Sequence, residues 1–443
     1  MKIALIMPRG PLYRIRGGIW KKSLRYAPLT LTTLASLIPK ELNAEIEIYD
    51  EGIEEIPSKI DADLIGITII TGTSLRGYSL AEKFRKEGKT VILGGVHATL
   101  MPQEAVQHAD AIAVGYAEQT WPQMLRDYKN GVLKKMYIEN NVDLSNLPFP
   151  RRDLLKHNYL TKHTIEATRG CIYKCEFCVV NPAWGNKQFQ KPVEDVVKDI
   201  QQMKAKELIF LDLNLIADMD YAKRLFRALA PIKVKWGGLT TVQIGWDEEL
   251  LDLCAKSGCK GLLIGLESLS LKTLQTTRKG FNLMKAYPDI IDGLHRRGIS
   301  LMGCFVFGLD GDDQSVFEKT AQFCLDTKID LPRFAICTPF PNTALFHRLK
   351  GEGRILTEDW GLYDGQHVVF QPKEMTVQES YDGTKWAWKK TYSTSSIFRR
   401  VLRSNMHLKQ LFKYTIPANF AYKYYAHNLS RFYTCGGVSP TEF

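Results

Sequence analysis

The sequence predicts an α/β protein built from two modules with parallel sheets, followed by a small, mainly helical C-terminal region. Two successive series of short apolar runs alternate with stretches of helical spacing, and a polar, proline-bearing stretch separates them. After about residue 350 this rhythm is lost. A chain of 443 residues with 45% hydrophobic content can bury more than one core. We expect modules at 1–140 and 161–350, a linker at 141–160 and the helical region at 351–443.

The first module is predicted to be a doubly wound, Rossmann-like domain. Apolar runs at 3–7, 45–49, 64–69, 91–93 and 111–114 are typical of strands, and the stretches 29–39, 79–86 and 102–108 have helical spacing. In such sheets a ligand binds beyond the carboxyl ends of the strands, where the strand order reverses. We therefore expect the turns at 8–10, 71–74 and 94–99 to face one ligand.

The second module is predicted to be a full or partial β/α barrel of the TIM type. Its strand-like runs are 164–168, 208–211, 234–237, 262–265, 301–307 and 334–337, separated by helical stretches such as 193–203, 247–255 and 284–297. Barrels of this type carry their chemistry at the carboxyl ends of the strands.

Composition narrows the cellular setting. The formal net charge of +11 could attract nucleic acid, anionic lipid or a phosphorylated substrate, and it does not choose among them. Nine cysteines are too sparse for a disulfide scaffold, which points to a reducing compartment. No apolar stretch approaches the roughly 20 residues that span a bilayer, and the apolar run at the start lacks a cleavage site behind it. We expect a cytoplasmic protein, soluble or peripheral to a membrane.

The motif TRGCIYKCEFC follows the first strand of the second module and brings Cys171, Cys175 and Cys178 onto one loop. Three thiolates can hold three irons of a [4Fe-4S] cluster, whereas an electron-transfer cluster normally takes four cysteines. One iron is then open to another ligand. The alternative is a structural zinc site, which requires a fourth protein ligand, but the next cysteine is Cys254.

This spacing, with Phe177 directly before the last cysteine, resembles the signature of the radical S-adenosylmethionine (SAM) superfamily. The resemblance implies that SAM chelates the open iron and is cleaved by one electron to a 5′-deoxyadenosyl radical. It also implies an electron donor such as a flavodoxin or ferredoxin. The segments FLDLNLIAD and LLIGLES resemble SAM-contacting strand ends of the family, which makes Asp212, Asn214, Glu267 and Ser268 candidate cofactor contacts. Glu267 is the candidate for a ribose diol, since a carboxylate can accept two hydrogen bonds.

The first module resembles the cobalamin-binding domain that precedes the radical SAM core in a large subclass. The matching pieces are RYAPLTLTTLASLIP, GITIITGTS, GGVHATLMPQEA and GYAEQTWPQML. The resemblance implies cobalamin contacts at Thr71, Gly72, Thr73, Ser74, Gly94, Gly95, His97, Ala98 and Gly115. The chain lacks the Asp-x-His-x-x-Gly element that supplies a histidine to cobalt, so the 71–74 loop is expected to cover the lower face. His97 is expected to be a plain loop histidine near the nucleotide tail.

One departure from the family pattern and one alternative interpretation remain for this domain. Where the family often has Gly-Glu-x-Glu, the chain has Gly115, Tyr116, Ala117 and Glu118, so the detailed contacts of the pocket for the nucleotide tail stay open. The other interpretation is a vestigial or differently occupied Rossmann-like domain.

The subclass resemblance extends to DWGLYDGQHVVFQPKEMTVQESYDGTKWAWKKTYS, which is similar to the C-terminal extension of cobalamin radical SAM proteins such as the hopanoid methylases. It implies a C-methyltransferase that methylates an unactivated carbon by means of methylcobalamin and the 5′-deoxyadenosyl radical. The substrate is expected to be a small or lipid-like molecule, and no residue is assigned to acid or base catalysis.

Three other functions stay open at this point. A cobalamin-dependent cyclase or ring-rearranging enzyme would share the architecture without methyl transfer. A methylthiotransferase of transfer RNA would need a second, N-terminal cysteine trio, but no cysteine precedes Cys171, and no nucleic-acid partner is expected. A cobalamin or cluster sensor would not need the full set of SAM-contacting strand ends.

The C-terminal tail interleaves basic and apolar residues. Its basic residues are Arg399, Arg400, Arg403, Lys409 and Lys413, and its apolar residues are Phe398, Leu402, Leu411, Phe412 and Tyr414. Such a segment could lie on an anionic membrane surface, or its apolar face could pack on the barrel.

Overall fold

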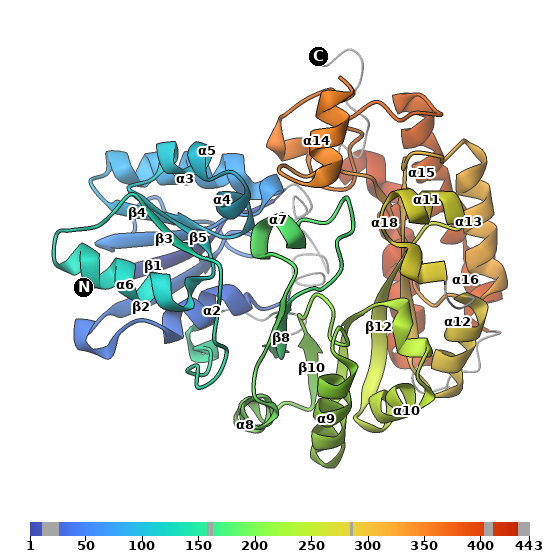
Figure 1. The fold of residues 1–443 in the computed structure, drawn as a ribbon, viewed down its shortest axis with the longest axis horizontal. Coiled ribbons are helices and arrows are strands. Elements are labelled where there is room, and N and C mark those ends of the chain that lie inside the picture. Colours follow the sequence, from blue (N-terminus) through green and yellow to red (C-terminus); the bar gives the residue numbers. More distant parts are fainter. Residues whose placement is uncertain (11–25, 157–158, 160–162, 284–286, 403–410, 433–443) are drawn as a thin grey trace.

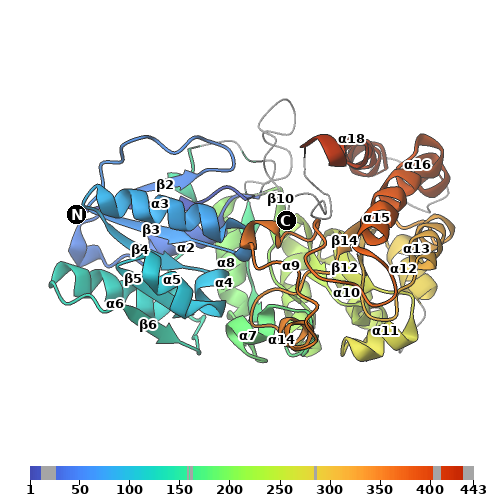
Figure 2. The ribbon, with the colours of Figure 1, turned by 90° about the horizontal axis from the view of Figure 1, so that it is seen from above.

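The structure is a computed structural model that describes residues 1–10, 26–156, 159, 163–283, 287–402 and 411–432. Two parallel sheets lie side by side along the long axis of the molecule, and the C-terminal helices lie at the far end from the first sheet (Figures 1 and 2).

The first sheet has six parallel strands in the order β2-β1-β3-β4-β5-β6. The strands are β1 (Lys2–Met7), β2 (Glu45–Asp50), β3 (Leu64–Thr68), β4 (Thr90–Gly94), β5 (Ala111–Gly115) and β6 (Met136–Glu139). This order follows the flavodoxin-like pattern rather than the usual dinucleotide-binding order, and it reverses between β1 and β3.

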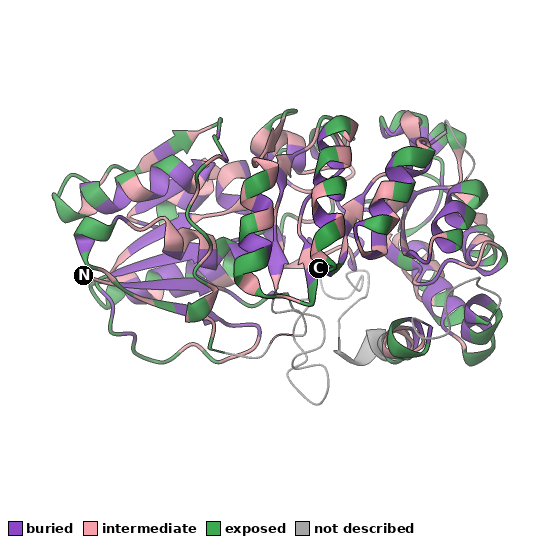
Figure 3. Cartoon of the chain, turned by 90° about the horizontal axis from the view of Figure 1, so that it is seen from below, coloured by how far each residue is buried: buried purple, intermediate pink, exposed green. Residues whose placement is uncertain are grey.

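Helices cover both faces of this sheet. They are α2 (Leu29–Ser36), α3 (Ser74–Lys86), α4 (Val96–Leu100), α5 (Pro102–His108) and α6 (Ala117–Lys129). Alternate residues of β1 enter two separate cores: Ala4 and Ile6 pack with side chains of α3 and α5, while Ile3 and Leu5 pack with those of α2 and α6. Figure 3 shows the strands buried between helices whose outer faces are exposed.

Three expectations for this module differ from the structure. The helix predicted at 79–86 begins at Ser74, and the loop predicted at 71–74 holds the 3₁₀ turn η3 (Thr71–Thr73) and the start of α3. The reason is packing: Gly77 has low helix propensity, but a Cβ there would lie 2.3 Å from Ile69 Cγ2, so only glycine lets α3 approach β3 this closely. The turn predicted at 94–99 is largely α4, and α6 and β6 were not predicted.

The second sheet has six parallel strands in the order β14-β13-β12-β11-β10-β7. They are β7 (Thr164–Ile165), β10 (Glu207–Phe210), β11 (Lys235–Thr240), β12 (Cys259–Glu267), β13 (Ser300–Phe307) and β14 (Arg333–Ile336). Within the described residues β7 and β14 do not pair, so the sheet forms a partial barrel. The strand predicted at 164–168 is divided, because β8 (Thr168–Gly170) leaves the sheet and pairs with β9 (Gln188–Gln190) in an antiparallel hairpin.

Helices cover the outside of the partial barrel. They are α8 (Val193–Met203), α9 (Met219–Leu229), α10 (Glu248–Lys256), α11 (Leu271–Thr276), α12 (Tyr287–Arg296) and α13 (Ser315–Asp326). Residues 284–286 of the predicted helix 284–297 lie outside the described residues. The buried residues of β12 and β13 alternate with partly exposed ones, so one face of the sheet packs on the helices and the other lines the barrel interior.

The remaining elements are helical. They are α7 (Val180–Trp184) after the cysteine loop, and then α14 (Ala344–Gly351), η8 (Trp360–Leu362), α15 (Val377–Thr391), α16 (Thr394–Val401), a π-helical turn η9 (Leu411–Thr415) and α18 (Ile416–Phe432). Helix α15 covers β14: Trp388 donates to the carbonyl of Phe334 at 3.2 Å and Tyr392 to that of Pro332 at 2.6 Å. No described helix combines the length and the hydropathy needed to cross a membrane.

Candidate cofactor site between the two sheets

The carboxyl edge of the first sheet faces the start of the second module (Figure 1). Arg169, at the end of β8, forms an ion pair with Glu118 of α6. The rings of Tyr116 and Phe189 meet edge to face at 5.4 Å. These contacts join the end of β5 to the β8–β9 hairpin, so the strand ends where both modules are expected to bind ligands lie close together.

The cysteine loop lies between β8 and α7. Cys171, Cys175 and Cys178 are free thiols, each partly exposed. Burial raises the pKa of the Cys175 thiol to about 12, an effect that Cys178, Glu267 and Cys171 reinforce and Lys279 opposes. The thiols and the charges of Glu267 and Lys279 are therefore close enough to influence one another's pKa.

The chemistry of the three side chains fits an iron–sulfur cluster, because thiolates are the ligands such clusters take and each thiolate binds a different iron. Among the described residues no group of three His, Cys, Asp or Glu side chains converges on one position for a single metal ion.

Ion pairs hold the cysteine loop from two sides. Arg169 contacts Glu166 at 2.9 Å besides Glu118. Within the loop, Glu176 accepts from Arg348 of α14 at 2.6 Å. Arg348 also binds Asp310 at 2.6 Å. The loop is thus fastened to the first module at one end and to α14 at the other.

A buried ion pair adjoins the thiols. Glu267 ends β12 in a left-handed conformation with φ of 63°, and its carboxylate binds Lys279. A Cβ at Gly265 would lie 2.1 Å from Glu267 Oε1 and 2.7 Å from Lys279 Nζ, so the pair occupies the barrel side of the strand. Burial lowers the pKa of Lys279, but Glu267 and the thiols of Cys175 and Cys178 raise it overall. Lys279 was not among the predicted site residues. The sequence feature that could have indicated it is its position near the end of LSLKTLQTTRKG, the segment that directly follows Ser268.

The other predicted SAM contacts divide into two groups. Asn214 lies at the thiols, with its Nδ2 4.0 Å from Cys171 Sγ and its Oδ1 buried without a protein partner. Asp212 is fully buried and turned toward the chain: it accepts from the backbone N–H groups of Ala167 and Thr168 and from the Thr168 hydroxyl at 2.7 Å. Burial raises the pKa of Asp212 to about 7. Asp212 thus ties β10 to the strand that leads into the cysteine loop.

Ser268 and Phe177 make protein contacts. Ser268 is buried, and its hydroxyl accepts from the N–H of Ser270 at 3.1 Å. Phe177 packs against an apolar cluster that includes Leu309 and Phe370. Phe177 lies in the cysteine loop and Ser268 directly follows Glu267, and the contacts described for both side chains are with other protein groups.

At the edge of the first sheet, the predicted cobalamin contacts are largely bonded to one another. The Ser74 hydroxyl donates to the Thr71 carbonyl at 2.9 Å, and that of Thr73 donates to the Ile70 carbonyl at 3.1 Å. His97 is fully buried, with Nδ1 3.3 Å from Thr71 Oγ1 and Nε2 3.2 Å from Glu104 Oε1. Both ring nitrogens of His97 therefore have protein partners.

The glycines of this edge are required by backbone geometry. Gly95 has φ of 96°, and a Cβ there would lie 2.7 Å from the carbonyl of Ile69. Gly115 has φ of 83°, and its Cβ would lie 2.1 Å from the carbonyl of Glu139. Glycine relieves strain at both positions, so these residues shape the edge, and the nearby Gly72, Gly94 and Ala98 belong to the same turns.

Apolar side chains are exposed on the facing edges. Ile70 and Leu75 flank η3 on the first module, while Ile172 and Leu213 lie on the cysteine loop and at the end of β10. Single exposed apolar side chains are common on protein surfaces, so these four residues do not by themselves indicate a ligand between the modules.

The segment 360–370, which lies in the predicted C-terminal extension, contacts both modules. Trp360 Nε1 donates to both oxygens of Glu104, at 3.0 and 3.1 Å, so η8 is joined to the His97 cluster. The carbonyl of Gly365 accepts from the N–H of Ile336 at 2.8 Å, at the end of β14. Phe370 belongs to the apolar cluster against which Phe177 of the cysteine loop packs.

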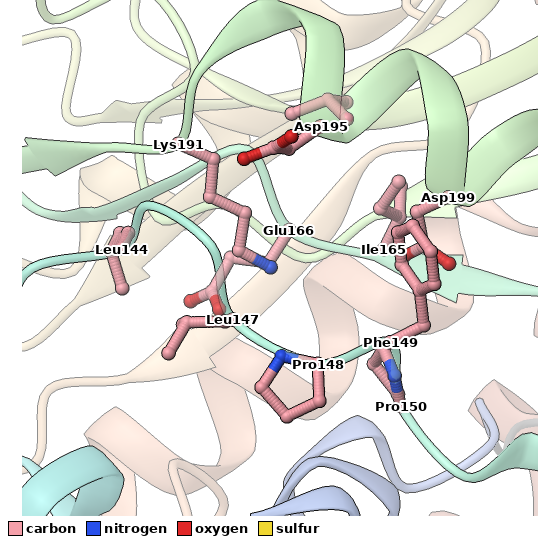
Figure 4. Close-up of a pocket in the computed structure, with 11 residues that line it drawn as sticks. Leu144, Leu147, Pro148, Phe149, Pro150, Ile165, Glu166, Lys191, Asp195 and Asp199 are labelled. Carbon is pink, nitrogen blue, oxygen red and sulfur yellow. The ribbon is translucent and has the colours of Figure 1, made fainter.

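A small pocket away from this site has a different lining. It lies between the stretch 144–150 and the start of α8, and Lys191, Asp195 and Asp199 surround it (Figure 4). Asp199 is already bound by Arg152 at 2.7 Å. The pocket contains none of the cysteines and is not part of the candidate site.

Sequence comparisons identify relatives over most of the chain. Residues 165–324 match the model of the radical SAM superfamily, and residues 343–432 match a domain of unknown function, DUF4070. Bacteriochlorophyllide d C-12(1)-methyltransferase of Chlorobaculum tepidum is 28% identical over 389 residues, which are 84% of each chain. Bacteriochlorophyllide d C-8(2)-methyltransferase of the same organism is 31% identical over 369 residues, 77% of this chain and 80% of the relative. A hopanoid C-2 methylase is also a relative.

The fold has a close counterpart among solved structures. The cobalamin-dependent SAM radical enzyme OxsB, with aqua-cobalamin and SAM bound, matches with a TM-score of 0.68 at 15% identity, over 97% of this chain and 72% of OxsB. This likeness concerns the arrangement of the two modules and the C-terminal region.

Proposed function

Because the chain belongs to the radical SAM superfamily, and within it to the group that contains the bacteriochlorophyllide methyltransferases, we propose that this enzyme is a cobalamin-dependent C-methyltransferase. The observation that carries the proposal is the meeting of two ligand-binding sheet edges at one place. Three thiols with one missing ligand lie on one edge, and a second parallel sheet presents its carboxyl edge opposite.

We propose that Cys171, Cys175 and Cys178 hold a [4Fe-4S] cluster, with Asn214, Glu267 and Lys279 beside it as contacts of SAM. When bound, the cluster and SAM supply one-electron chemistry, and cobalamin supplies a carrier for the methyl group. The paired charges of Glu267 and Lys279 suit the hydroxyl and carboxylate groups of SAM. The residues of η3 and the turns after β4 and β5 would form the cobalamin site, with Ile70 and Leu75 against its apolar surface.

The chain's own part in the reaction is positioning and exclusion of water. The ion pairs of Arg169 and Arg348 fix the cysteine loop relative to both modules. The segment 360–370 covers the mouth of the barrel from the first module to the cysteine loop. Fixed reactants and a dry site favour reaction of a radical with its intended partner over side reactions.

The substrate is a small molecule, and we propose that it is apolar. Leu239, Leu263 and Met302 lie side by side on β11, β12 and β13, as the strand register shows. Their neighbours Leu262 and Leu301 pack on the outer helices, so these three side chains face the barrel interior, where they stay partly exposed. A partly exposed apolar wall inside a barrel fits a lipid-like substrate.

Two further partners are part of the proposal. An external reductant such as a flavodoxin or ferredoxin would supply the electron. The C-terminal helices would touch an anionic membrane: Phe398 and Leu402 of α16 and Phe420 and Tyr424 of α18 are exposed, and the rings of Phe398 and Phe420 meet at 6.4 Å. Residues 393–432 contain no aspartate or glutamate.

Part of the basic and apolar segment packs inside the protein, which was the other interpretation of this segment. Arg400 and Leu411 are buried, and Arg400 donates to the carbonyls of Ile329 and Asp330. Its planar donor fork fits these carbonyls, which explains why a charged residue lies inside. Arg403 and Lys409 lie outside the described residues.

The decisive experiment uses anaerobically reconstituted protein with SAM, a reductant, cobalamin and cell extract as the substrate source. Methyl transfer yields 5′-deoxyadenosine together with S-adenosylhomocysteine, and label from the SAM methyl group appears in the product. A cyclase would yield 5′-deoxyadenosine without S-adenosylhomocysteine, and a sensor would yield neither. The Cys175→Ala variant is the control that lacks the cluster.

A further inference from the structure

Residues Asp364 and His367 form a buried pair inside the segment 360–370. The carboxylate of Asp364 lies 3.0 and 3.1 Å from Nδ1 of His367, and the two side chains are 3% and 5% exposed. Asp364 Oδ1 also accepts from the backbone N–H groups of Gln366 at 2.8 Å and His367 at 3.1 Å. The carboxylate is therefore fixed in place.

The pair defines the chemistry of the other ring nitrogen. A carboxylate accepts hydrogen bonds, so the neutral imidazole carries its proton on Nδ1 and presents a lone pair at Nε2. Within the described residues Nε2 of His367 has no hydrogen-bond partner, and it is not among the fully buried polar atoms that lack one, so this nitrogen keeps some accessible surface in an otherwise buried side chain. An accessible lone pair that no protein group occupies is free to accept a hydrogen bond from a donor on a bound ligand.

His367 belongs to a segment that contacts several parts of the candidate site. The segment touches Glu104 of the first module through Trp360, the end of β14 through Gly365, and the cysteine loop through Phe370. A Cβ at Gly365 would lie 3.8 Å from Cβ of Ala335, a residue on the interior side of β14. His367 therefore belongs to the mouth of the barrel.

Two other buried histidines have different surroundings. Both ring nitrogens of His97 are occupied by Thr71 and Glu104. His295 of α12 is paired through Nε2 with Asp330 at 2.8 Å, in the outer shell of the barrel. His367 differs from both because its Nδ1 is paired and its Nε2 is open.

We infer that Nε2 of His367 accepts a hydrogen bond from a hydroxyl or N–H group of the substrate. The substrate is then an apolar molecule that carries a hydrogen-bond donor, and Asp364 is a positioning residue that sets the tautomer. This inference rests on the proposed function, since it assigns a group to the substrate site of that enzyme.

The test compares 1-naphthol, an apolar donor, with 1-methoxynaphthalene, which has the same body and no donor. Binding to the full-length reconstituted protein is followed by ligand fluorescence. The wild-type protein is expected to bind 1-naphthol about two- to tenfold more tightly, the range of one hydrogen bond. Equal affinities, or no binding of either compound, would overturn the inference.

Variants locate the effect. His367→Phe should abolish the preference for 1-naphthol. Asp364→Asn keeps the oxygen that accepts from the backbone but places an N–H₂ group against Nδ1, which moves the ring proton to Nε2 and should also remove the preference. His295→Gln, a change in a buried His–Asp pair outside the site, is the matched control and should keep it.

Iron content and circular dichroism verify that each variant is folded. If folded His367→Phe protein still prefers 1-naphthol, the inference is wrong. A His367→Gln variant keeps a polar side chain at this position, so it is the variant to use if His367→Phe does not fold, and it should retain part of the preference. Formation of 5′-deoxyadenosine and S-adenosylhomocysteine tests the proposed function separately. Both nucleosides without a naphthol preference would refute only the role of His367.

Discussion

At the scale of single residues, the charges of the site depend on one another. Glu267 and Lys279 are each about one-tenth exposed, and within the described part of the chain each forms an ion pair only with the other, which compensates both charges for leaving water. Removing one charge leaves the other buried and unpaired, whereas removing both leaves two neutral groups of similar volume.

We predict that Lys279→Met lowers the free energy of unfolding by about 3 to 5 kcal/mol, because it leaves Glu267 unpaired. The double variant Glu267→Gln, Lys279→Met should regain most of this loss. Urea unfolding measures both. Lys350→Met, in the exposed pair with Glu358, is the control and should cost less than about 1 kcal/mol. Equal losses in Lys279→Met and the control would contradict the prediction.

Asp212 predicts a pH dependence of stability. Burial raises its pKa to about 7 in the folded protein, while a carboxyl group in the unfolded chain titrates at about 4. The folded state therefore binds more protons between these pH values, so this residue's contribution to the free energy of unfolding falls as pH rises from about 4 to about 7.

We expect the difference in unfolding free energy between about pH 5 and about pH 8 to shrink in Asp212→Asn protein. Asp313→Asn is the control, since Asp313 is exposed and its pKa is lowered by the hydroxyl and the N–H of Ser315. An unchanged pH dependence in Asp212→Asn would show that Asp212 is ionised in the folded protein throughout this range.

At the scale of elements, the segment 360–370 holds the modules together. Trp360 supplies two contacts to Glu104, which also bonds to His97. Although burial opposes it, hydrogen bonds from His97, Trp360 and Tyr78 lower the pKa of Glu104. The carboxylate is therefore the anchor of η8 on the first module.

Replacing Trp360 by Phe keeps an aromatic ring but removes the indole N–H donor and part of the buried indole. We expect a loss of about 1.5 to 3 kcal/mol, as for hydrogen bonds to charged groups, and faster hydrogen exchange of the amides in α4 and α5. Trp386→Phe, on the exposed side of α15, should change neither. Unchanged exchange in Trp360→Phe would mean that η8 is held by apolar packing alone.

The sequence predicted most of the strands, including the edge strands β2 and β14, and missed β6 and the helix α6. Strands such as β3 and β13 are continuous or alternating apolar runs between helices, and such strands are recognisable from composition. Strand β6 is a short edge strand with mixed burial, flanked by lysines and asparagines, and gives little signal. The β8–β9 hairpin is set by tertiary contacts of Arg169 and Gln188 rather than by local pattern.

The sequence indicated the three cysteines as candidate ligands, which stay a prediction, and did not indicate the residues that lie beside them. The cysteine spacing is local, so it is visible in the sequence. Lys279 and His367 reach the site only through folding, from a turn after α11 and from a stretch without regular structure. Asp212 lies at the predicted strand end but turns inward, because three donors of residues 167 and 168 surround it.

At the scale of the whole molecule, the two modules face each other while the exposed apolar side chains of α16 and α18 lie at the far end (Figure 2). A membrane contact there would leave the first module away from the bilayer. Arg399 is paired with Asp326 and Lys413 with Glu207, so part of the positive charge is already compensated. Insertion of apolar side chains is therefore expected to contribute more to the free energy of membrane binding than attraction between charges.

We predict cosedimentation of the protein with phosphatidylglycerol vesicles and weaker binding to phosphatidylcholine vesicles. The double variant Phe398→Ser, Phe420→Ser should reduce binding to the vesicles several-fold, since it removes apolar area that membrane binding would bury in the bilayer. Val132→Ser, at an apolar site on the first module that is even more exposed (60%, against 41% for Phe398 and 40% for Phe420), is the control. Equal binding of the double variant and the wild type would exclude this surface.

The fastening of the cysteine loop by late parts of the chain has a consequence for biogenesis. Glu176 and Phe177 depend on Arg348 and Phe370, which leave the ribosome long after the cysteines. A nascent chain therefore exposes its thiols before the covering residues exist. The thiols are therefore easiest to reach for cluster insertion while the chain is still being synthesised. In a chain that is released without its cluster, we expect the contact between the cysteine loop and α14 to open before the cluster is inserted.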